Sequence, residues 1–235
     1  MWIVAALLAF HVVHAVTANR WEFQGGKWAQ GFLLLGTQVP LFFAACYYAY
    51  HEGVFSRQLV SPVYIGLGAL LGHLIFVLSL LITHGSLEDS RSHLFGFGDL
   101  WRFTVENPVV LYRFITVGVA EEIIWRAAAQ PILIGATGSA ALGIIVTAIL
   151  FAVVHKHFFR NSLTVSFEFL IFSLLVGVLY FWTGSLILVI VIHTVRDVEI
   201  AYLEYLIKVD ELDGDEEAAV REIERMYMPK RPEMS

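Results

Sequence analysis

Residues 108–130 read PVVLYRFITVGVAEEIIWRAAAQ, an apolar run of membrane-spanning length that also contains Glu121, Glu122 and Arg126. A charged side chain near the centre of a bilayer costs about 2.5 to 3.5 kcal/mol on insertion scales. Three such residues therefore oppose much of the gain from the surrounding apolar side chains. The run predicts a helix whose charges are either compensated by one another or used for function.

The rest of the chain has the same apolar character. Of its 235 residues 58% are hydrophobic and 15% charged, and the mean hydropathy is +0.71, which is outside the usual range of soluble proteins. We expect an all-α, polytopic membrane helix bundle with about seven transmembrane helices. Apolar runs long enough to span a bilayer lie at residues 1–18, 29–50, 62–83, 108–130, 138–158, 164–182 and 185–207.

The predicted organisation is a transmembrane bundle at residues 1–207, with a catalytic core at about 108–207, followed by a polar tail at 208–235. Apolar residues at helical spacing in the tail indicate a short amphipathic helix. Residues 84–106 are mixed in charge and are expected to form a long loop at the cytoplasmic interface.

The positive charges predict the orientation in the membrane. When the loops are assigned alternately to the two sides, eleven Lys and Arg residues fall on one side and only Arg57 on the other. By the positive-inside rule the N-terminus faces outward and the tail is cytoplasmic. The net charge of -6 comes largely from acidic residues near the C-terminus, so it indicates no nucleic-acid partner. The length favours a prokaryotic cell membrane, and the expected partner is the lipid bilayer.

Helical spacing separates the three charges at positions 121–126 of the run at 108–130. Glu122 and Arg126 stand at i and i+4 with the acid first, the favourable order for an ion pair. Glu121 lies about 100° around the helix and points away from that pair. A carboxylate in a site of low dielectric is a candidate general base or acid.

Two later runs supply imidazoles. His155 lies one turn after Phe151, and His193 lies at i, i+4 with Asp197. Ionisable residues within membrane bundles usually face the interior and mark function. A count of about 1.5 Å per residue places Glu121 and His193 roughly 20 Å from the cytoplasmic end, but it leaves His155 only about 5 Å from it. The count therefore predicts no contact between His155 and Glu121 unless the helices are tilted or extended.

Three motifs now stand in order on three predicted helices: EEIIWR (121–126), FAVVH (151–155) and HTVRD (193–197). They resemble the E-E-x-x-x-R, F-x-x-x-H and H-x-x-x-N motifs of the CPBP family, also called Abi, of CAAX-type prenyl endopeptidases and bacteriocin-processing proteins, which are similar to type II CAAX prenyl proteases. The resemblance covers about a third of the chain.

The resemblance implies an intramembrane endopeptidase of the glutamate type, without a metal or other cofactor, that cuts near the C-terminus of a membrane-associated or lipidated protein or peptide. Glu121 would activate water with the help of His155. Glu122 and Arg126 would hold the geometry of the site, and His193 and the residue at 197 would stabilise the oxyanion.

This chain departs from the pattern at Asp197, because an ionised Asp cannot donate to an oxyanion as Asn can. Either Asp197 is protonated, or it orients the ring of His193, which is then the donor. Three alternatives remain open at the level of sequence. Glu121, His155 and His193 could instead hold a hydrolytic zinc ion; the buried acids and imidazoles could form a proton or solute pathway in a transporter; or the chain could be a non-catalytic immunity or scaffold protein.

Overall fold

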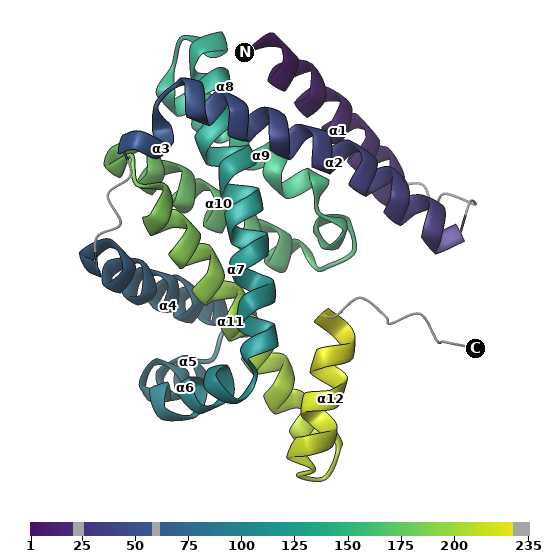
Figure 1. The fold of residues 1–235 in the computed structure, drawn as a ribbon. Helices are drawn as coiled ribbons and strands as arrows, with labels where there is room; N and C mark the ends of the chain where they lie inside the picture. Colours follow the sequence, from purple (N-terminus) through teal and green to yellow (C-terminus); the bar gives the residue numbers. More distant parts are fainter. Residues whose placement is uncertain (21–25, 58–61, 228–235) are drawn as a thin grey trace. The chain divides into compact units, whose positions relative to one another are not determined.

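The computed structural model describes residues 1–20, 26–57 and 62–227, and the regular structure in these ranges is entirely helical. The last eight residues of the predicted polar tail, 228–235, lie outside the described ranges. The helices are α1 (Trp2–Arg20), α2 (Gly26–His51), α3 (Val54–Arg57), α4 (Pro62–His84), α5 (Leu87–Phe95), α6 (Phe97–Glu106), α7 (Pro108–Glu122), the π-helix η1 (Ile123–Ala129), α8 (Gln130–Thr137), α9 (Ala140–Val154), the 3₁₀ helix η2 (Lys156–Phe159), α10 (Leu163–Thr183), α11 (Leu186–Glu211) and α12 (Glu216–Tyr227) (Figure 1).

Each of the seven predicted apolar runs is helical over most of its length. Among the described helices, α4 and α10 are long and apolar enough to cross a bilayer, and α1 and α9 contain shorter apolar stretches. The all-helical prediction is therefore confirmed, whereas seven membrane crossings remain a prediction.

The chain divides into two compact units. The first contains Met1–Ile65 and Ala120–Val189, and the second contains Gly66–Val119 and Ile190–Ser235. Three helices, α4, α7 and α11, contribute residues to both units.

In the first unit α1 packs on α2, α2 packs on η1, and α9 packs on both α8 and α10. Gly138 ends α8 in the left-handed conformation at φ 64°, and the hydroxyl of Ser139 accepts a hydrogen bond from the backbone of Leu142 at the start of α9. These two signals make the tight α8–α9 hairpin. Its close packing is visible at Gly143, where an added Cβ would lie 2.6 Å from the backbone of Ile134.

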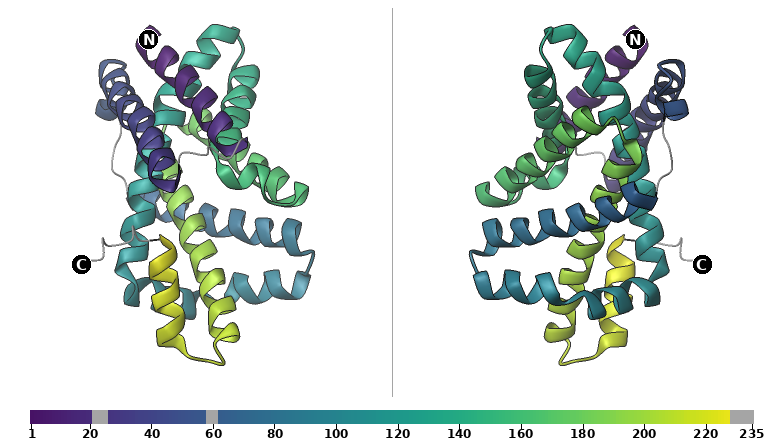
Figure 2. Two further views of the ribbon diagram at one scale, coloured as in Figure 1. Left: turned by 90° about the vertical axis from the view of Figure 1, so that its right-hand side faces the viewer. Right: turned by 90° about the vertical axis from the view of Figure 1, so that its left-hand side faces the viewer.

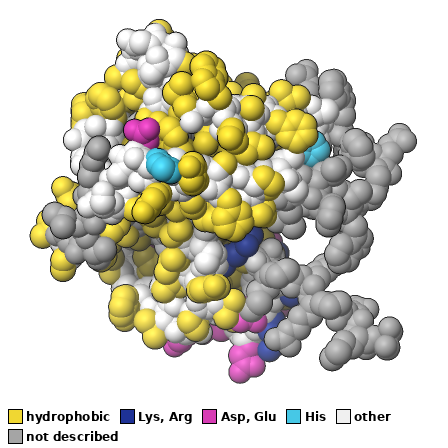
Figure 3. Space-filling view, turned by 45° about the horizontal axis from the view of Figure 1, so that its top comes forward, with side chains coloured by type: hydrophobic (Ala, Val, Ile, Leu, Met, Phe, Trp, Pro, Cys, Tyr) yellow, Lys and Arg dark blue, Asp and Glu magenta, His cyan; other side chains and the backbone are white. Residues whose placement is uncertain are grey.

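Large apolar side chains of the first unit also face outward, as expected for helices in contact with lipid. They include Phe10 and Val13 of α1 and Phe43 and Tyr47 of α2. Hydrophobic side chains dominate the face seen in Figure 3.

In the second unit α5 turns back along α4, and α12 lies beside the end of α11 (Figures 1 and 2). An apolar core joins α6, α7, α11 and α12. The small residue Gly72 lets α4 approach α11 closely, because a Cβ there would meet the carbonyl oxygen of Ile192 at 2.9 Å. The members of the core are Phe103, Val110, Phe114, Val198, Ala201, Tyr202, Tyr205, Ala219 and Ile223.

The expectation of a long loop at residues 84–106 was wrong, because this segment forms α5 and α6. The polar composition suggested a loop, but Leu100 and Phe103 stand three residues apart on one face of α6 and pack into the core of the second unit. Tertiary burial of that face stabilises a helix that composition alone does not favour.

Candidate active site

The EEIIWR motif (121–126) overlaps the start of a π-helix. Residues Ile123–Ala129 are π-helical and all seven are buried, so the predicted continuous α-helix at 108–130 is interrupted. The cause lies just beyond it: Pro131 has no backbone N–H, and its ring would clash with the carbonyl four residues earlier in an ordinary α-helix. The backbone N–H of Gln130 accordingly bonds to the carbonyl of Trp125, five residues back. Such wide turns occur frequently at functional sites.

Glu122 and Arg126 form a buried ion pair, with 3.3 Å between Oε2 of the acid and Nε of the guanidinium. Neither side chain is exposed. The guanidinium also donates from Nη2 to the hydroxyl of Ser173 at 3.2 Å and lies 5.0 Å from the ring centroid of Phe151. The pair therefore fixes η1 against α9 and α10, and its two charges largely compensate each other.

Glu121 contacts His155, with 3.5 Å between Oε1 and Nε2. The side chain of Glu121 is 15% exposed and that of His155 is 21% exposed, so both are mostly buried but reachable by water. The sequence-based depth count placed these residues far apart. It failed because it assumed that the helix runs straight on through His155, whereas α9 ends at Val154.

The backbone around His155 explains how the ring reaches Glu121. α9 ends at Val154, and His155 follows in an extended conformation (φ −86°, ψ 127°) before η2 begins. Its Nδ1 lies 2.6 Å from the carbonyl oxygen of Phe151. A carbonyl can only accept, so Nδ1 carries the proton of this bond and Nε2 is the nitrogen that faces Glu121.

Because Nδ1 donates its proton to the carbonyl of Phe151, a proton placed between Glu121 and His155 can lie on the carboxylate or on Nε2. This is the arrangement that moving a proton during hydrolysis requires. The rings of Phe151 and Phe169 lie 4.6 and 5.0 Å from that of His155 and make its surroundings apolar.

In the second unit His193 contacts Asp197, with 3.4 Å between Nε2 and Oδ2. The guanidinium of Arg196 lies 3.7 Å from the other oxygen of the same carboxylate, although helical geometry points the two side chains in different directions. His193 is buried, and α7 approaches the next residue of α11 closely because Gly118 has no side chain: a Cβ there would lie 3.0 Å from the hydroxyl oxygen of Thr194.

The candidate residues thus occur as three pairs. Glu121–His155 and Glu122–Arg126 belong to the first unit, and His193–Asp197 belongs to the second.

Comparison with protein families identifies the segment that carries these pairs. Residues 104–198 match the model of a family described as type II CAAX prenyl endopeptidase Rce1-like. This segment is an Rce1-like domain. The description names an endopeptidase of the CAAX prenyl type, in agreement with the resemblance seen in the three motifs. No curated protein and no solved structure matches the chain.

The Rce1-like domain contains all six candidate residues, but a further ionisable cluster lies outside it. His73, His93 and Glu199 come together in the second unit, and the potential ligand atoms of the three lie within 4.8 Å of one another. Sequence reasoning gave them no joint role, because no motif spacing connects α4, α5 and α11. The one available signal was that His73 and Glu199 are ionisable residues within apolar runs.

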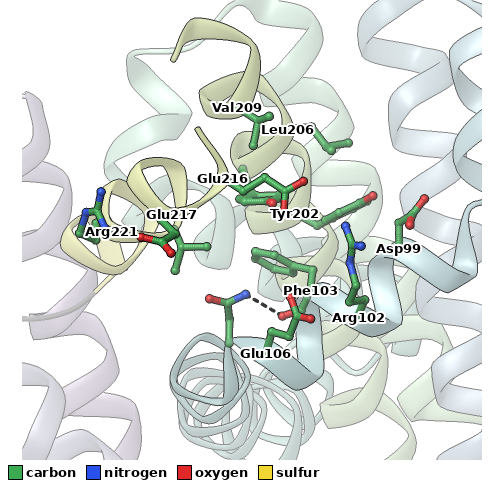
Figure 4. A pocket seen from close by; sticks show the side chains of 13 residues that line it. Asp99, Arg102, Phe103, Glu106, Tyr202, Leu206, Val209, Glu216, Glu217 and Arg221 are labelled. Atoms are coloured by element: carbon green, nitrogen blue, oxygen red, sulfur yellow. Dashed lines mark hydrogen bonds and ion pairs between the residues drawn. The ribbon is translucent and has the colours of Figure 1, made fainter. Parts of the chain in front are cut away.

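The second unit also contains a cavity of about 540 Å³, shown in Figure 4, which includes none of the six candidate residues. Its walls come from α6, α11 and α12 and combine aromatic rings with charges of both signs. It is lined by Asp99, Arg102, Phe103, Glu106, Asn107, Tyr202, Tyr205, Leu206, Val209, Glu216, Glu217, Val220 and Arg221.

Proposed function

We propose that the chain is an intramembrane endopeptidase in which Glu121 activates water to hydrolyse a peptide bond. The observation that carries this proposal is the contact of Glu121 with His155, whose other ring nitrogen is committed to the carbonyl of Phe151. A carboxylate in this position takes a proton from water as water attacks the peptide carbonyl, and the imidazole shares that proton. The proton is then delivered to the leaving amine.

Attack on the carbonyl creates a negatively charged oxygen that needs a hydrogen-bond donor. We assign this role to His193, as the motif resemblance implies. The contact with Asp197 supports an orienting role for that carboxylate. In that role the carboxylate holds the orientation of the ring, and an N–H of His193 donates to the oxyanion.

Glu122 and Arg126 are positioning residues in this proposal. Their ion pair and the contact with Ser173 hold the π-helical turn that follows Glu121. They need not touch the substrate.

For the substrate we propose a membrane-associated or lipidated protein or peptide that is cut near its C-terminus. The family description, which names a prenyl endopeptidase, and the outward-facing apolar side chains of α1 and α2 support this class. We further propose that the reaction itself uses no metal, that the N-terminus lies outside the cell membrane and that α12 lies in the cytoplasm.

The test is cleavage by the purified chain. Wild type, Glu121→Gln and the control Glu88→Gln, which makes the same change at an exposed site, are offered a library of C-terminally tagged peptides with and without a prenyl group. We expect the products to appear with wild type and with Glu88→Gln and to be lost with Glu121→Gln. Undiminished cleavage by Glu121→Gln contradicts the proposal, and proton or solute flux into liposomes without cleavage favours a transporter.

Asp197→Asn separates the two roles of residue 197. If Asp197 orients His193, the substitution lowers the cleavage rate at neutral pH. A retained or increased rate would instead show that residue 197 itself donates to the oxyanion, as the family's Asn is expected to do.

A further inference from the structure

His73, His93 and Glu199 converge in the second unit from three helices, α4, α5 and α11. Nδ1 of His73 lies 2.9 Å from Oε1 of Glu199, and Nε2 of His93 lies 3.0 Å from Oε2 of the same carboxylate. The side chains are 4%, 9% and 1% exposed, so solvent does little to compensate their charges.

The hydrogen bonds of His73 fix where its protons are. Nε2 lies 3.3 Å from the backbone carbonyl of Leu94, which can only accept, so Nε2 carries a proton. In a neutral ring Nδ1 then has a lone pair, and this lone pair faces the carboxylate of Glu199. Two acceptors at 2.9 Å need a proton or a metal ion between them, and the proton can be carried by His73 or by Glu199.

The surroundings make the ion pair costly. The ring centroid of Phe97 lies 4.4 Å from that of His73, and the ring of Phe76 lies 4.9 Å from that of His93. In such apolar surroundings a charged imidazole and a carboxylate both lose their hydration, and their mutual attraction must offset that loss. A divalent cation, in contrast, uses both imidazole lone pairs and the carboxylate as ligands.

We propose that His73, His93 and Glu199 form a zinc-binding site. Two imidazoles and one carboxylate are a common ligand set for zinc, with bonds of about 2.0 to 2.2 Å and an open fourth position. The potential ligand atoms already lie within 4.8 Å of one another, so one ion can be placed among them. The carbonyl of Leu94 holds His73 in the tautomer that presents Nδ1, which is the usual arrangement behind a metal-bound histidine.

The site ties together parts of the chain that are far apart in sequence, since 126 residues separate His73 from Glu199. Bound zinc joins α5 to α4 and α11 and thereby stabilises the second unit. None of the three ligands is one of the six candidate peptidase residues, although Glu199 follows Asp197 by two residues on α11.

The zinc site also affects what can be concluded if a chelator abolishes peptide cleavage by the chain. Loss of cleavage on chelation would indicate a catalytic metal at Glu121, His155 and His193 only if the bound zinc depends on those residues. Zinc that depends on His93 instead assigns the loss to destabilisation of the second unit.

The test is metal analysis of the full chain, purified in detergent without a histidine tag. We expect about one zinc per chain after incubation with zinc and gel filtration. His93→Gln and Glu199→Gln each remove a direct ligand and should weaken zinc binding by at least about 10- to 100-fold, the loss that is typical when a residue behind a ligand is changed. His84→Gln, at an exposed position of α4, is the matched control and should retain zinc.

A second measurement needs no variant. A strong chelator should lower the melting temperature of wild type, and added zinc should restore it. Absence of stoichiometric zinc from wild type, or a melting temperature indifferent to chelation, overturns the proposal in favour of a metal-free ion pair. Zinc that persists in both ligand variants but is lost in Glu121→Gln also overturns it and places the metal at the peptidase residues.

Discussion

The Glu122–Arg126 ion pair allows a quantitative test of how the charges within the first motif are compensated. Neither side chain is exposed, and the acid lies 3.3 Å from the guanidinium. Glu122→Gln leaves a buried guanidinium with the Ser173 contacts and the ring of Phe151 but without its counter-ion. Removing one partner of a buried pair costs about 3 to 5 kcal/mol.

Removing both partners should cost much less than the sum of the single changes. Arg126→Met fills a similar volume without a charge, and replacing a whole buried pair by well-packed residues is often close to neutral. We therefore expect a coupling free energy of at least about 2 kcal/mol between Glu122→Gln and Arg126→Met, within the range for residues in contact. At about 2 to 4 °C per kcal/mol for a chain of this size, each single change should lower the melting temperature by about 6 to 20 °C.

The assay is a double-mutant cycle, measured by reversible denaturation of the purified protein in mixed micelles. The exposed pair Glu217–Arg221 of α12, at 3.5 Å, is the control and should give a coupling of only about 0.3 to 0.5 kcal/mol. If the buried pair couples no more strongly than this exposed one, charge compensation does not explain why the motif is tolerated.

Two further predictions concern the second unit. Gly72→Ala places a Cβ 2.9 Å from the carbonyl oxygen of Ile192 and should destabilise the protein by about 1 to 3 kcal/mol. The control Gly66→Ala, on the same helix with no atom within 4 Å of the added Cβ, should stabilise the protein by up to about 1 kcal/mol. Equal effects of the two substitutions in thermal denaturation would refute the contact between α4 and α11. Burial, and then the hydrogen bond to Glu204, raise the pKa of Tyr227 above its ordinary value of 10.0. Because the folded state holds the Tyr227 proton more tightly than the unfolded state does, the tyrosine stabilises the fold below pH 10 and loses this effect as the pH rises further. Limited proteolysis should therefore release α12 at alkaline pH in wild type and show a weaker pH dependence in Tyr227→Phe.

The sequence predicted the features that depend on local spacing. Apolar runs located the main helices, and the i, i+4 rule anticipated the contacts of Glu122 with Arg126 and of His193 with Asp197. These contacts form within one stretch of helical chain, so they need no knowledge of how helices pack.

Features that depend on packing between helices were not predictable in the same way. His155 reaches Glu121 because α9 ends one residue earlier and the chain becomes extended. A count of residues along straight helices does not include such a change of backbone conformation. The zinc ligands His73 and His93 likewise meet Glu199 only through tertiary packing. The π-helix had a local signal in Pro131, but proline more often ends or kinks a helix than widens one.

The most direct test of the proposed chemistry is the single-turnover cleavage rate of Glu121→Gln, His155→Gln and the double variant, with wild type as the reference. If the two residues act as one proton-transferring unit, each single change lowers the rate by about 10² to 10⁴. The double variant should then be no slower than the worse single variant, because residues that act as a unit are not additive. Losses that multiply in the double variant, or a rate within tenfold of wild type for Glu121→Gln, would contradict a shared role in activating water.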